Sequence, residues 1–260
     1  MTNTFETVLK RNLISAYKKE GESWKNALER ARLELNLSSD TKLSILGRLD
    51  EMAEGLILIG IDVSADEKQK LIDTEKVYEW SLLLGATTDT HDILGLVESV
   101  WDLGELPHDF NDICVNVSGE LILPYPAFSS KNIGGEPLWK LSREGADVEM
   151  PNRKMNIISH ELLETKNISS KNLLQEITER IQKVEGDFRQ EEILGAWQKA
   201  LVADCNLIEV RFKTEVSSGT YIRAVAHSWG QKLGCGAIAL RIKRTKIGEF
   251  VLCDIDKYKL

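Results

Sequence analysis

The chain has 260 residues, of which 42% are hydrophobic and 28% charged, so it can bury a sizeable core and wholesale disorder is excluded. Its 41 acidic residues outnumber its 33 basic residues, and the net charge of −8 by itself disfavours a nucleic-acid-binding protein. There is no apolar run near the roughly 18 residues of a membrane span and no basic-then-apolar leader after Met1, so we expect neither a membrane anchor nor a secretory signal.

The predicted elements mix helices and strands without a regular repeat. Residues 4–17 fit either an opening helix or a short strand. Ser23 is placed to cap a helix whose apolar residues recur at helical spacing and which ends near residues 36–39. The apolar run at 56–61 predicts a buried strand, and the segment 76–85 predicts another.

The second part of the chain continues this mixture. The polar stretch 87–92 predicts a loop, and a stretch rich in Pro, Ser and Gly at 124–135 interrupts the chain. Ser170 begins a strongly amphipathic helix. Residues 208–216 alternate in polarity, which predicts a half-buried strand with its charged residues facing solvent. Residues 219–233 predict a helix with one buried face, and the irregular order of elements favours an α+β fold.

Metal and nucleotide sites find little support. The four cysteines never form a C-x-x-C pair, which excludes a ribbon-type zinc site and argues against a disulfide framework. The four histidines are scattered, and the common phosphate-loop and serine-hydrolase motifs are absent. Asp89-x-x-Asp92 with His91 could bind a cation, but this pattern is more typical of a loop that caps itself. We therefore expect reduced thiols in a cytoplasmic protein without metal or organic cofactor.

Positive charge is concentrated in one stretch. Between Arg211 and Gly248 there are eight lysines and arginines and a single acidic residue, Glu215, so this stretch carries +7. A polyanion responds to the potential of the face that it meets rather than to the charge of the whole molecule. The stretch is therefore either a nucleic-acid-binding strip or a solvated basic face.

One segment places a carboxylate between two glycines: Gly47-Arg48-Leu49-Asp50-Glu51-Met52-Ala53-Glu54-Gly55. A single glycine-flanked Asp is usually a turn residue, but this segment resembles the G-x-L-D-P-x-A-x-G-x-L signature of the TruB family of pseudouridine synthases, which act on uridine 55 of tRNA. Further motifs similar to those of the family follow in the family's order over about residues 12–250. They are Lys18-x-x-Gly21-x-Ser23, Lys76-Val77-Tyr78, Leu84-Gly85-x-x-Thr88-Asp89-Thr90-x-Asp92, Phe128 to Trp139, Arg143-Glu144-Gly145, Ser218 to Arg223 and Leu233 to Arg241.

The resemblance implies an α+β fold of the pseudouridine-synthase type, with a mixed, mostly antiparallel central sheet flanked by helices. It implies one catalytic domain over residues 1–260, an RNA-gripping insertion at about 128–153 and no additional C-terminal domain. The implied activity is isomerisation of uridine to pseudouridine in tRNA, at position 55 of the T arm, through a catalytic aspartate and base flipping. We expect tRNA as the partner and a monomeric protein.

The site residues follow from the same resemblance. Breaking and remaking the bond between sugar and base requires a carboxylate beside their junction, as nucleophile or as base. The resemblance assigns this carboxylate to Asp50, its cationic partner to Arg223 and the ring that stacks on the target base to Tyr78. We expect the side chains of Asp50 and Arg223 within hydrogen-bonding reach. The expected substrate contacts are Gly47, Leu49, Gly55, Leu240, Lys131, Arg241, Lys243 and Arg244.

These contacts have different expected roles. The two glycines, Gly47 and Gly55, allow the backbone to approach the ribose closely. Leu240 lines the pocket and excludes water from the freed base. The basic residues bind phosphates without reading bases, and we expect the +7 stretch to form a strip on the same side of the molecule as Asp50.

Three positions depart from the family pattern. Lys19 and Glu51 stand where the family has proline, and Ile45 is nearest to the family's histidine. Glu51 adds a second negative charge beside Asp50. These departures leave open a non-catalytic RNA-binding or RNA-folding protein on the same fold. A hydrolase that uses Asp50 and Glu54 is a third alternative, although the apolar strand that follows argues against the helical spacing it needs.

Overall fold

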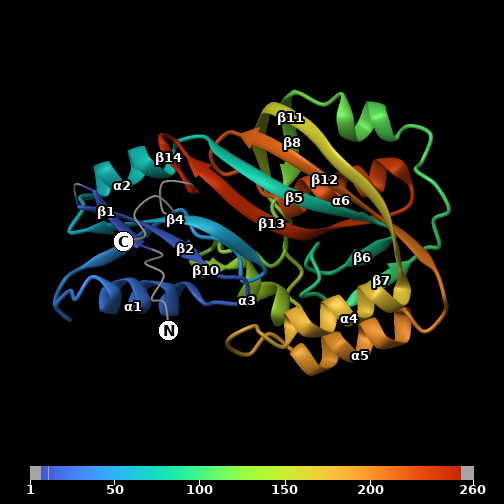
Figure 1. Cartoon of the computed structure of the whole chain (residues 1–260), viewed down its shortest axis with the longest axis horizontal. Helices are drawn as coiled ribbons and strands as arrows, with labels where there is room; N and C mark the ends of the chain where they lie inside the picture. The colour runs from blue at the N-terminus through green and yellow to red at the C-terminus, as the bar shows by residue number, and fades with distance from the viewer. Residues whose placement is uncertain (1–6, 11, 253–260) are drawn as a thin grey trace.

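The computed structural model describes residues 7–10 and 12–252, and a ten-stranded sheet organises them (Figure 1). The strands of this sheet are β1 (Thr7–Lys10), β2 (Leu13–Lys18), β3 (Leu43–Leu46), β4 (Ala53–Ile61), β5 (Lys76–Leu84), β8 (Gly119–Pro124), β11 (Asn152–Ser169), β12 (Asn206–Val216), β13 (Ala237–Ile247) and β14 (Phe250–Val251). Their order is β1-β2-β4-β13-β5-β12-β11-β8, with β3 paired to β4 and β14 to β13. Of these pairs only β4 and β13 run in parallel, so the expectation of a mostly antiparallel sheet is confirmed.

Two small sheets and seven helical segments complete the described part of the chain. The small sheets pair β6 (Ala86–Thr88) with β7 (Val97–Val100) and β9 (Asn132–Ile133) with β10 (Glu136–Pro137). The helices are α1 (Trp24–Glu34), α2 (Ala65–Ile72), the π-helical turn η1 (Asn111–Val115), α3 (Leu138–Arg143), α4 (Ser170–Ile181), α5 (Gln190–Ala200) and α6 (Ile222–Leu233). None of the helices formed by the described residues is long and apolar enough to cross a membrane.

Capping side chains mark the starts of α1 and α4, and a glycine turn precedes α6. The Ser23 hydroxyl accepts a hydrogen bond from the backbone N–H of Asn26, so the expected cap of α1 is confirmed. Helix α4 begins at Ser170, as expected, and the Ser169 side chain caps it. Helix α6 begins at Ile222 rather than at Gly219, because Gly219 has φ +76 and lies in a left-handed turn.

The opening segment forms strands rather than a helix. Residues 4–17 fitted both structures, and their described part contains β1 and most of β2, while residues 4–6 and 11 lie outside the described ones. In β2 the side chains alternate between half-buried and buried, which is the two-residue period of a strand. The polar stretch 87–92 is a turn that begins inside the short strand β6.

Side chains of the sheet are buried on both faces. One face packs against α1 and α6, with Trp80 and Phe212 of the sheet meeting Trp229 of the helix. On the other face α4 and α5 cover one end, where they lie side by side (Figure 1), and α2 lies at the other end. Between these two helical covers, polar side chains of β5, β12 and β13 line an open groove of about 700 Å³.

The alternation expected for β12 fails at one residue. Glu209 is only 1% exposed, although the pattern placed its carboxylate in solvent. The Ser81 hydroxyl donates to this carboxylate across 2.7 Å, and Lys166 forms an ion pair with it at 3.0 Å. Burial raises the pKa of Glu209, but these two partners bring it below its ordinary value. The Arg241 guanidinium lies 3.7 Å from the same carboxylate, and these three partners together accommodate the charged residue inside.

Candidate active site

Asp50 lies in the loop between β3 and β4, and a buried lysine fixes the backbone of this loop. Lys18 is 1% exposed, and its Nζ donates to the carbonyl oxygens of Glu51 at 3.2 Å and Ala53 at 2.8 Å. The backbone N–H of Gly21 donates to the same Glu51 carbonyl at 2.9 Å. The backbone on the C-terminal side of Asp50 is thus held in place, while the Asp50 side chain keeps 40% of its exposure.

Arg223, in the first turn of α6, gathers three separate segments around its guanidinium. Its Nε donates to Asp50 Oδ2 across 2.7 Å, so the expected proximity of these two side chains is confirmed. Its other nitrogens donate to the carbonyl oxygens of Thr90 at 2.8 Å and Phe128 at 3.2 Å. A second carboxylate, that of Asp92, lies 3.6 Å from Nε. Arg223 is only 3% exposed, so its guanidinium is sheltered from water while the Asp50 carboxylate remains partly open to it.

Two carboxylates keep this buried cation charged. Burial alone lowers the pKa of Arg223, but Asp50 and Asp92 raise it above its ordinary value. Burial raises the pKa of Asp92, against the opposing effects of Arg223 and of the Thr90 hydroxyl, which donates to Oδ1 across 2.7 Å. Arg223 is therefore a permanent positive charge that orients the carboxylate of Asp50.

Two other titratable groups lie near Asp50. Burial and then the charge of Asp50 raise the pKa of Glu51. Burial and then the same charge raise the pKa of Tyr221 to about 12, so its phenol keeps its proton at neutral pH. The Tyr221 ring packs edge-on against Tyr125 with centroids 5.4 Å apart. Tyr221 was not among the expected site residues, although it lies in the same motif as Arg223 and two positions before it.

The wall of a cavity of about 440 Å³ contains Asp50, Arg223 and Leu49, so the structure brings together three of the expected site residues. Aromatic side chains from separate segments line the same cavity, namely Trp24, Phe128, Trp139 and Phe188. Besides Arg223, the basic residues that line the cavity are Arg48, Arg143 and Arg189. Aromatic faces and guanidinium groups around a carboxylate suit an unstacked nucleotide, whose base stacks on rings and whose phosphates bind arginines.

Tyr78 and Leu240 are not among the lining residues of this cavity. Tyr78 lies on β5, is 7% exposed and belongs to the core on the face covered by α6. Leu240 lies on β13, is 1% exposed and packs against the opposite face, beneath α4 and α5. Adjacent strands of one sheet carry these two residues, but their side chains belong to different cores.

Arg244 is a structural residue, so the expectation that it binds phosphate is wrong. Its side chain is 2% exposed, and it donates to the carbonyl oxygens of Leu56 and Gly47, each at 2.8 Å. Gly55 lies opposite Arg244 where β4 and β13 run in parallel. A Cβ on Gly55, whose φ is +111, would stand 2.3 Å from the Arg244 carbonyl oxygen. Gly55 therefore allows two strands to approach each other. This close approach explains why a glycine stands here, and no contact with a ribose is needed to explain it.

The other expected phosphate contacts have mixed surroundings. Arg241 forms an ion pair with Glu176, with an N–O distance of 2.6 Å. Lys243 is partly exposed and lines the open groove between the helical covers. The acidic residues Glu79, Glu161 and Glu215 line the same groove. Lys131 is exposed, and its Nζ lies 5.6 Å from the centre of the Tyr125 ring. The +7 stretch is thus divided by acidic partners and does not form an unbroken basic strip at the Asp50 cavity.

Within residues 12–252 there is no group of three or more His, Cys, Asp or Glu side chains that could hold a metal ion. Asp89, His91 and Asp92 form a turn, in which His91 has φ +63 and stacks on His227 with ring centroids 3.7 Å apart. Burial, followed by His227, lowers the pKa of His91 to about 3. The cysteines of the described part, all buried and free, are Cys114, Cys205 and Cys235, while Cys253 lies outside it.

Comparison with known proteins connects this geometry to a family. The model of the TruB family pseudouridylate synthase (N-terminal domain) matches residues 35–188. The chain is 27% identical over 244 residues to tRNA pseudouridine synthase B of Thermotoga petrophila, which covers 94% of this chain and 65% of that protein. It is 30% identical over 220 residues to the protein of the same name from Clostridium tetani, covering 84% and 62%. The chain thus spans slightly less than two thirds of the length of these relatives.

Solved structures share the fold. A Cbf5-Nop10-Gar1 complex contains a chain that matches with a TM-score of 0.53 at 20% identity, covering 95% of this chain and 54% of that one. An H/ACA RNP bound to a substrate RNA containing 2'-deoxyuridine matches with a TM-score of 0.52 at 18% identity, covering 92% and 48%. At these identities the likeness concerns the fold alone, and it confirms the expected α+β class.

Proposed function

The chain belongs to the TruB family of pseudouridylate synthases, and on this premise we propose that it converts a uridine of tRNA to pseudouridine. The proposed target is uridine 55 in the T arm, and the proposed place of action is the cytoplasm, where the protein works as a monomer. The observation that carries the proposal is the hydrogen-bonded pair of Asp50 and Arg223 at the wall of an aromatic cavity. The other protein segments around the cavity then have roles in holding RNA.

The reaction is an isomerisation, so all atoms of the nucleotide are retained. The bond between N1 of uracil and C1′ of the ribose breaks, the uracil turns, and C5 forms a bond to C1′. C5 loses a proton and N1 gains one. Asp50 acts at the sugar as nucleophile or as base, for which its side chain has the necessary exposure. Arg223 holds the carboxylate in one orientation and balances its charge.

The target base must leave its stack to reach a carboxylate at the cavity wall. We propose that the segment 128–153 grips the RNA, since Phe128, Trp139 and Arg143 of this segment line the cavity. Such rings and guanidinium groups bind unstacked bases and phosphates. Stacking of Tyr78 on the base and exclusion of water by Leu240 enter the proposal on the family resemblance alone.

The direct test is to incubate the protein with unmodified tRNA transcripts and to map pseudouridine by position. We expect the modification at the T-arm uridine and none with Asp50→Asn. Binding of tRNA without any pseudouridine would instead support the non-catalytic RNA-binding alternative. The observation that favours this alternative is Glu51, which stands beside Asp50 where the family has proline. The hydrolase alternative needs Asp50 and Glu54 on one face of a helix, and Glu54 lies in strand β4 instead.

A further inference from the structure

A pair of helices is inserted between two strands that need only a turn. Strands β11 and β12 are antiparallel neighbours, and their register ends with Ser169 opposite Asn206. A turn of about two to five residues is enough to join such strands. Here residues 170–205 intervene and form α4 and α5, which we call the helical hairpin. The hairpin closes at its base, where the backbone N–H of Ser170 donates to the Cys205 carbonyl at 2.8 Å.

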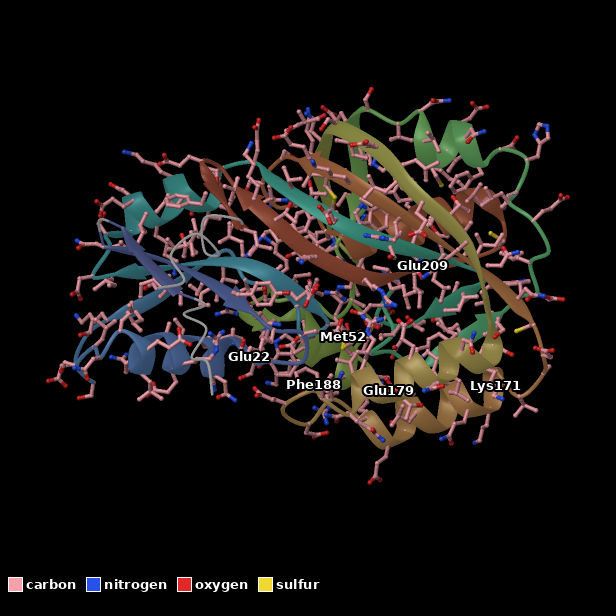
Figure 2. All side chains as sticks on the ribbon, viewed as in Figure 1. Glu22, Met52, Lys171, Glu179, Phe188 and Glu209 are labelled. Atoms are coloured by element: carbon pink, nitrogen blue, oxygen red, sulfur yellow. The ribbon has the colours of Figure 1, made fainter. Side chains whose placement is uncertain are left out.

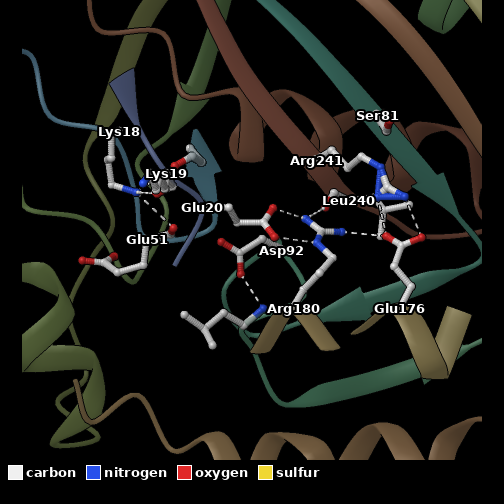
Figure 3. A network of polar contacts seen from close by, with 12 residues as sticks. Lys18, Lys19, Glu20, Glu51, Ser81, Asp92, Glu176, Arg180, Leu240 and Arg241 are labelled. Atoms are coloured by element: carbon white, nitrogen blue, oxygen red, sulfur yellow. Dashed lines mark hydrogen bonds and ion pairs between the residues drawn. The ribbon is translucent and has the colours of Figure 1, made fainter. Parts of the chain in front are cut away.

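A buried arginine anchors the hairpin to the catalytic domain (Figure 3). Arg180, near the end of α4, is 7% exposed and donates to both carboxylate oxygens of Glu20, at 2.9 and 2.6 Å. It also donates to the carbonyl oxygen of Leu240 on β13 at 2.8 Å and to Glu176 of its own helix at 2.8 Å. The hairpin is thereby fixed to the loop after β2 and to the central sheet.

The loop at the tip of the hairpin is fixed as well. Gly21 has φ +80, and a Cβ there would stand 2.6 Å from the carbonyl oxygen of Lys183. The N–H of Glu185 donates to the Gly21 carbonyl at 2.9 Å, and its carboxylate accepts from the N–H of Ser23 at 2.9 Å and from the Asn26 amide at 2.6 Å. These bonds lower the pKa of Glu185, the bond from Ser23 most. The tip therefore lies on the start of α1 in a defined position.

From this position the tip reaches the cavity of Asp50. Figure 2 shows Phe188 at the end of the hairpin nearest Met52, with Lys171 at the far end. Three consecutive residues of the tip, Asp187, Phe188 and Arg189, line the cavity. Arg189 donates to Asp89 at 3.0 Å, and its guanidinium carbon lies 5.0 Å from the centre of the Phe128 ring.

The tip also meets the segment 128–153 across the cavity. Asp187 accepts a hydrogen bond from Arg143 at 2.8 Å. Arg143 and Arg189 line both this cavity and a neighbouring groove that contains Glu98 and Glu192. The two arginines thus lie between the site of Asp50 and the neighbouring groove.

We propose that the tip of the helical hairpin binds the RNA strand beside the target nucleotide, with Phe188 stacking on a flanking base and Arg189 binding a flanking phosphate. This inference rests on the proposed function and adds to it a substrate-binding element. The hairpin as a whole carries seven acidic and five basic residues, so its outer surface does not attract RNA, and contact is confined to the tip. A planar ring and a guanidinium side by side are the groups that bind bases and phosphates of unpaired strands.

The test compares Phe188→Ala, Phe188→Trp and Arg189→Ala with Lys171→Ala, which removes one positive charge from the far end of the same hairpin. KM and kcat for pseudouridine formation are measured with an unmodified tRNA transcript at several salt concentrations. We expect Phe188→Ala to raise KM about 5- to 100-fold, the range that one base–aromatic stack provides, with kcat within about threefold. Phe188→Trp retains the wild-type KM. Arg189→Ala lowers the log–log salt slope of binding by about 0.7 to 0.9, and Lys171→Ala leaves it unchanged.

The outcomes separate this inference from the function on which it rests. Unchanged KM and salt slope in both tip variants of an active enzyme would overturn the inference and leave the function standing. Equal loss of kcat with constant KM would also overturn it, because the tip would then act only through the structure of the site. If the wild-type protein forms no pseudouridine, the same variants are assayed for tRNA binding. Weaker binding by the tip variants, but not by Lys171→Ala, then supports the tip as an RNA contact while the proposed function fails.

Discussion

The Nε of Arg223 donates to Oδ2 of Asp50 across 2.7 Å, although 173 positions separate the two residues in the chain. Asp50 lies in the loop between β3 and β4, and Arg223 lies in the first turn of α6, so neither local structure nor composition brings them together. The pair depends on the whole sheet between them. It is also the relationship on which the proposed chemistry depends.

Asp50→Asn should abolish pseudouridine formation and leave the fold and tRNA binding largely intact. The amide fills the same space and can still contact Arg223, but it is neither a nucleophile nor a base. Single-turnover assays on a tRNA transcript, with a thermal melt and a binding titration, check this. Glu54→Gln, a carboxylate removed from β4, serves as the control and should keep its activity. Activity of Asp50→Asn within tenfold of wild type would remove Asp50 from the mechanism.

Arg223→Met should abolish activity and also destabilise the fold. The substitution leaves the buried carboxylate of Asp92 without its cation, and breaking a buried ion pair from one side typically costs about 3–5 kcal/mol. Adding Asp92→Asn to this variant should recover part of the stability but none of the activity. Chemical denaturation of both variants measures the effect. A double variant no more stable than the single one would show that the Asp92 charge is not the source of the loss.

Arg244→Ala should lower stability by about 1–3 kcal/mol for each of the two buried carbonyl groups that lose their donor. Lys243→Ala, one position earlier and partly exposed, should leave the melting temperature within experimental error. Thermal melts of the two variants make the comparison. If Arg244→Ala melts like wild type and instead weakens the salt dependence of tRNA binding, the residue is a phosphate contact after all.

Gly55→Ala should destabilise the protein more than Gly119→Ala. Both glycines have a positive φ, +111 and +92, so both substitutions carry backbone strain of about 1 kcal/mol or more. Only at Gly55 does the new Cβ meet the backbone of Arg244, whereas nothing lies within 4 Å at Gly119. The difference between their free energies of unfolding isolates the contact of β4 with β13. Equal losses would mean that the two strands can separate without cost.

His91→Asn should flatten the acid side of the stability profile. The folded protein keeps the pKa of His91 at about 3, below its ordinary value of 6.5. Between these values the unfolded chain binds a proton that the folded chain does not, so the free energy of unfolding falls as pH falls from about 6.5 toward 3. Asparagine tolerates the φ of +63 and does not titrate. Denaturation at pH 7 and pH 5 measures the slope. His108→Asn removes an exposed histidine whose pKa Asp109 raises, so this variant should not flatten the profile.

Periodicity was sufficient to predict three helices, α1, α4 and α6, and three strands, β4, β5 and β12, whereas α2, α3, α5, β8, β11 and β13 had no predicted counterpart. The apolar spacing after Ser23 and the alternation in 208–216 both correspond to elements of the structure. Pairing of distant residues is another matter. The proximity of Asp50 and Arg223 was predicted from the family resemblance, since nothing in the local pattern relates a loop after β3 to the first turn of α6.

The failures have different physical causes. In β13 the register with β5 shifts between Ala239 and Arg241 and again between Arg244 and Lys246, so the two-residue period no longer tells which basic residue faces inward. Arg244 is buried on the same face as Ile242, and a charge count treated it as exposed. Phe188 and Arg189 lie outside every motif quoted for the family. They reach the cavity because the helical hairpin between β11 and β12 carries them there, and no local pattern indicates this.

The position of β13 also determines when the site can exist. This strand follows almost every other element in the chain, yet it lies in the interior of the sheet, between β4 and β5. Until it is inserted, β4 and β5 are separated edges, the carbonyl of Gly47 lacks its donor Arg244, and the hairpin lacks the Leu240 carbonyl on which Arg180 is anchored. Contacts of such long sequence separation form late and slowly. We therefore expect the Asp50 loop to reach the shape described here only after β13 has paired with both of these strands.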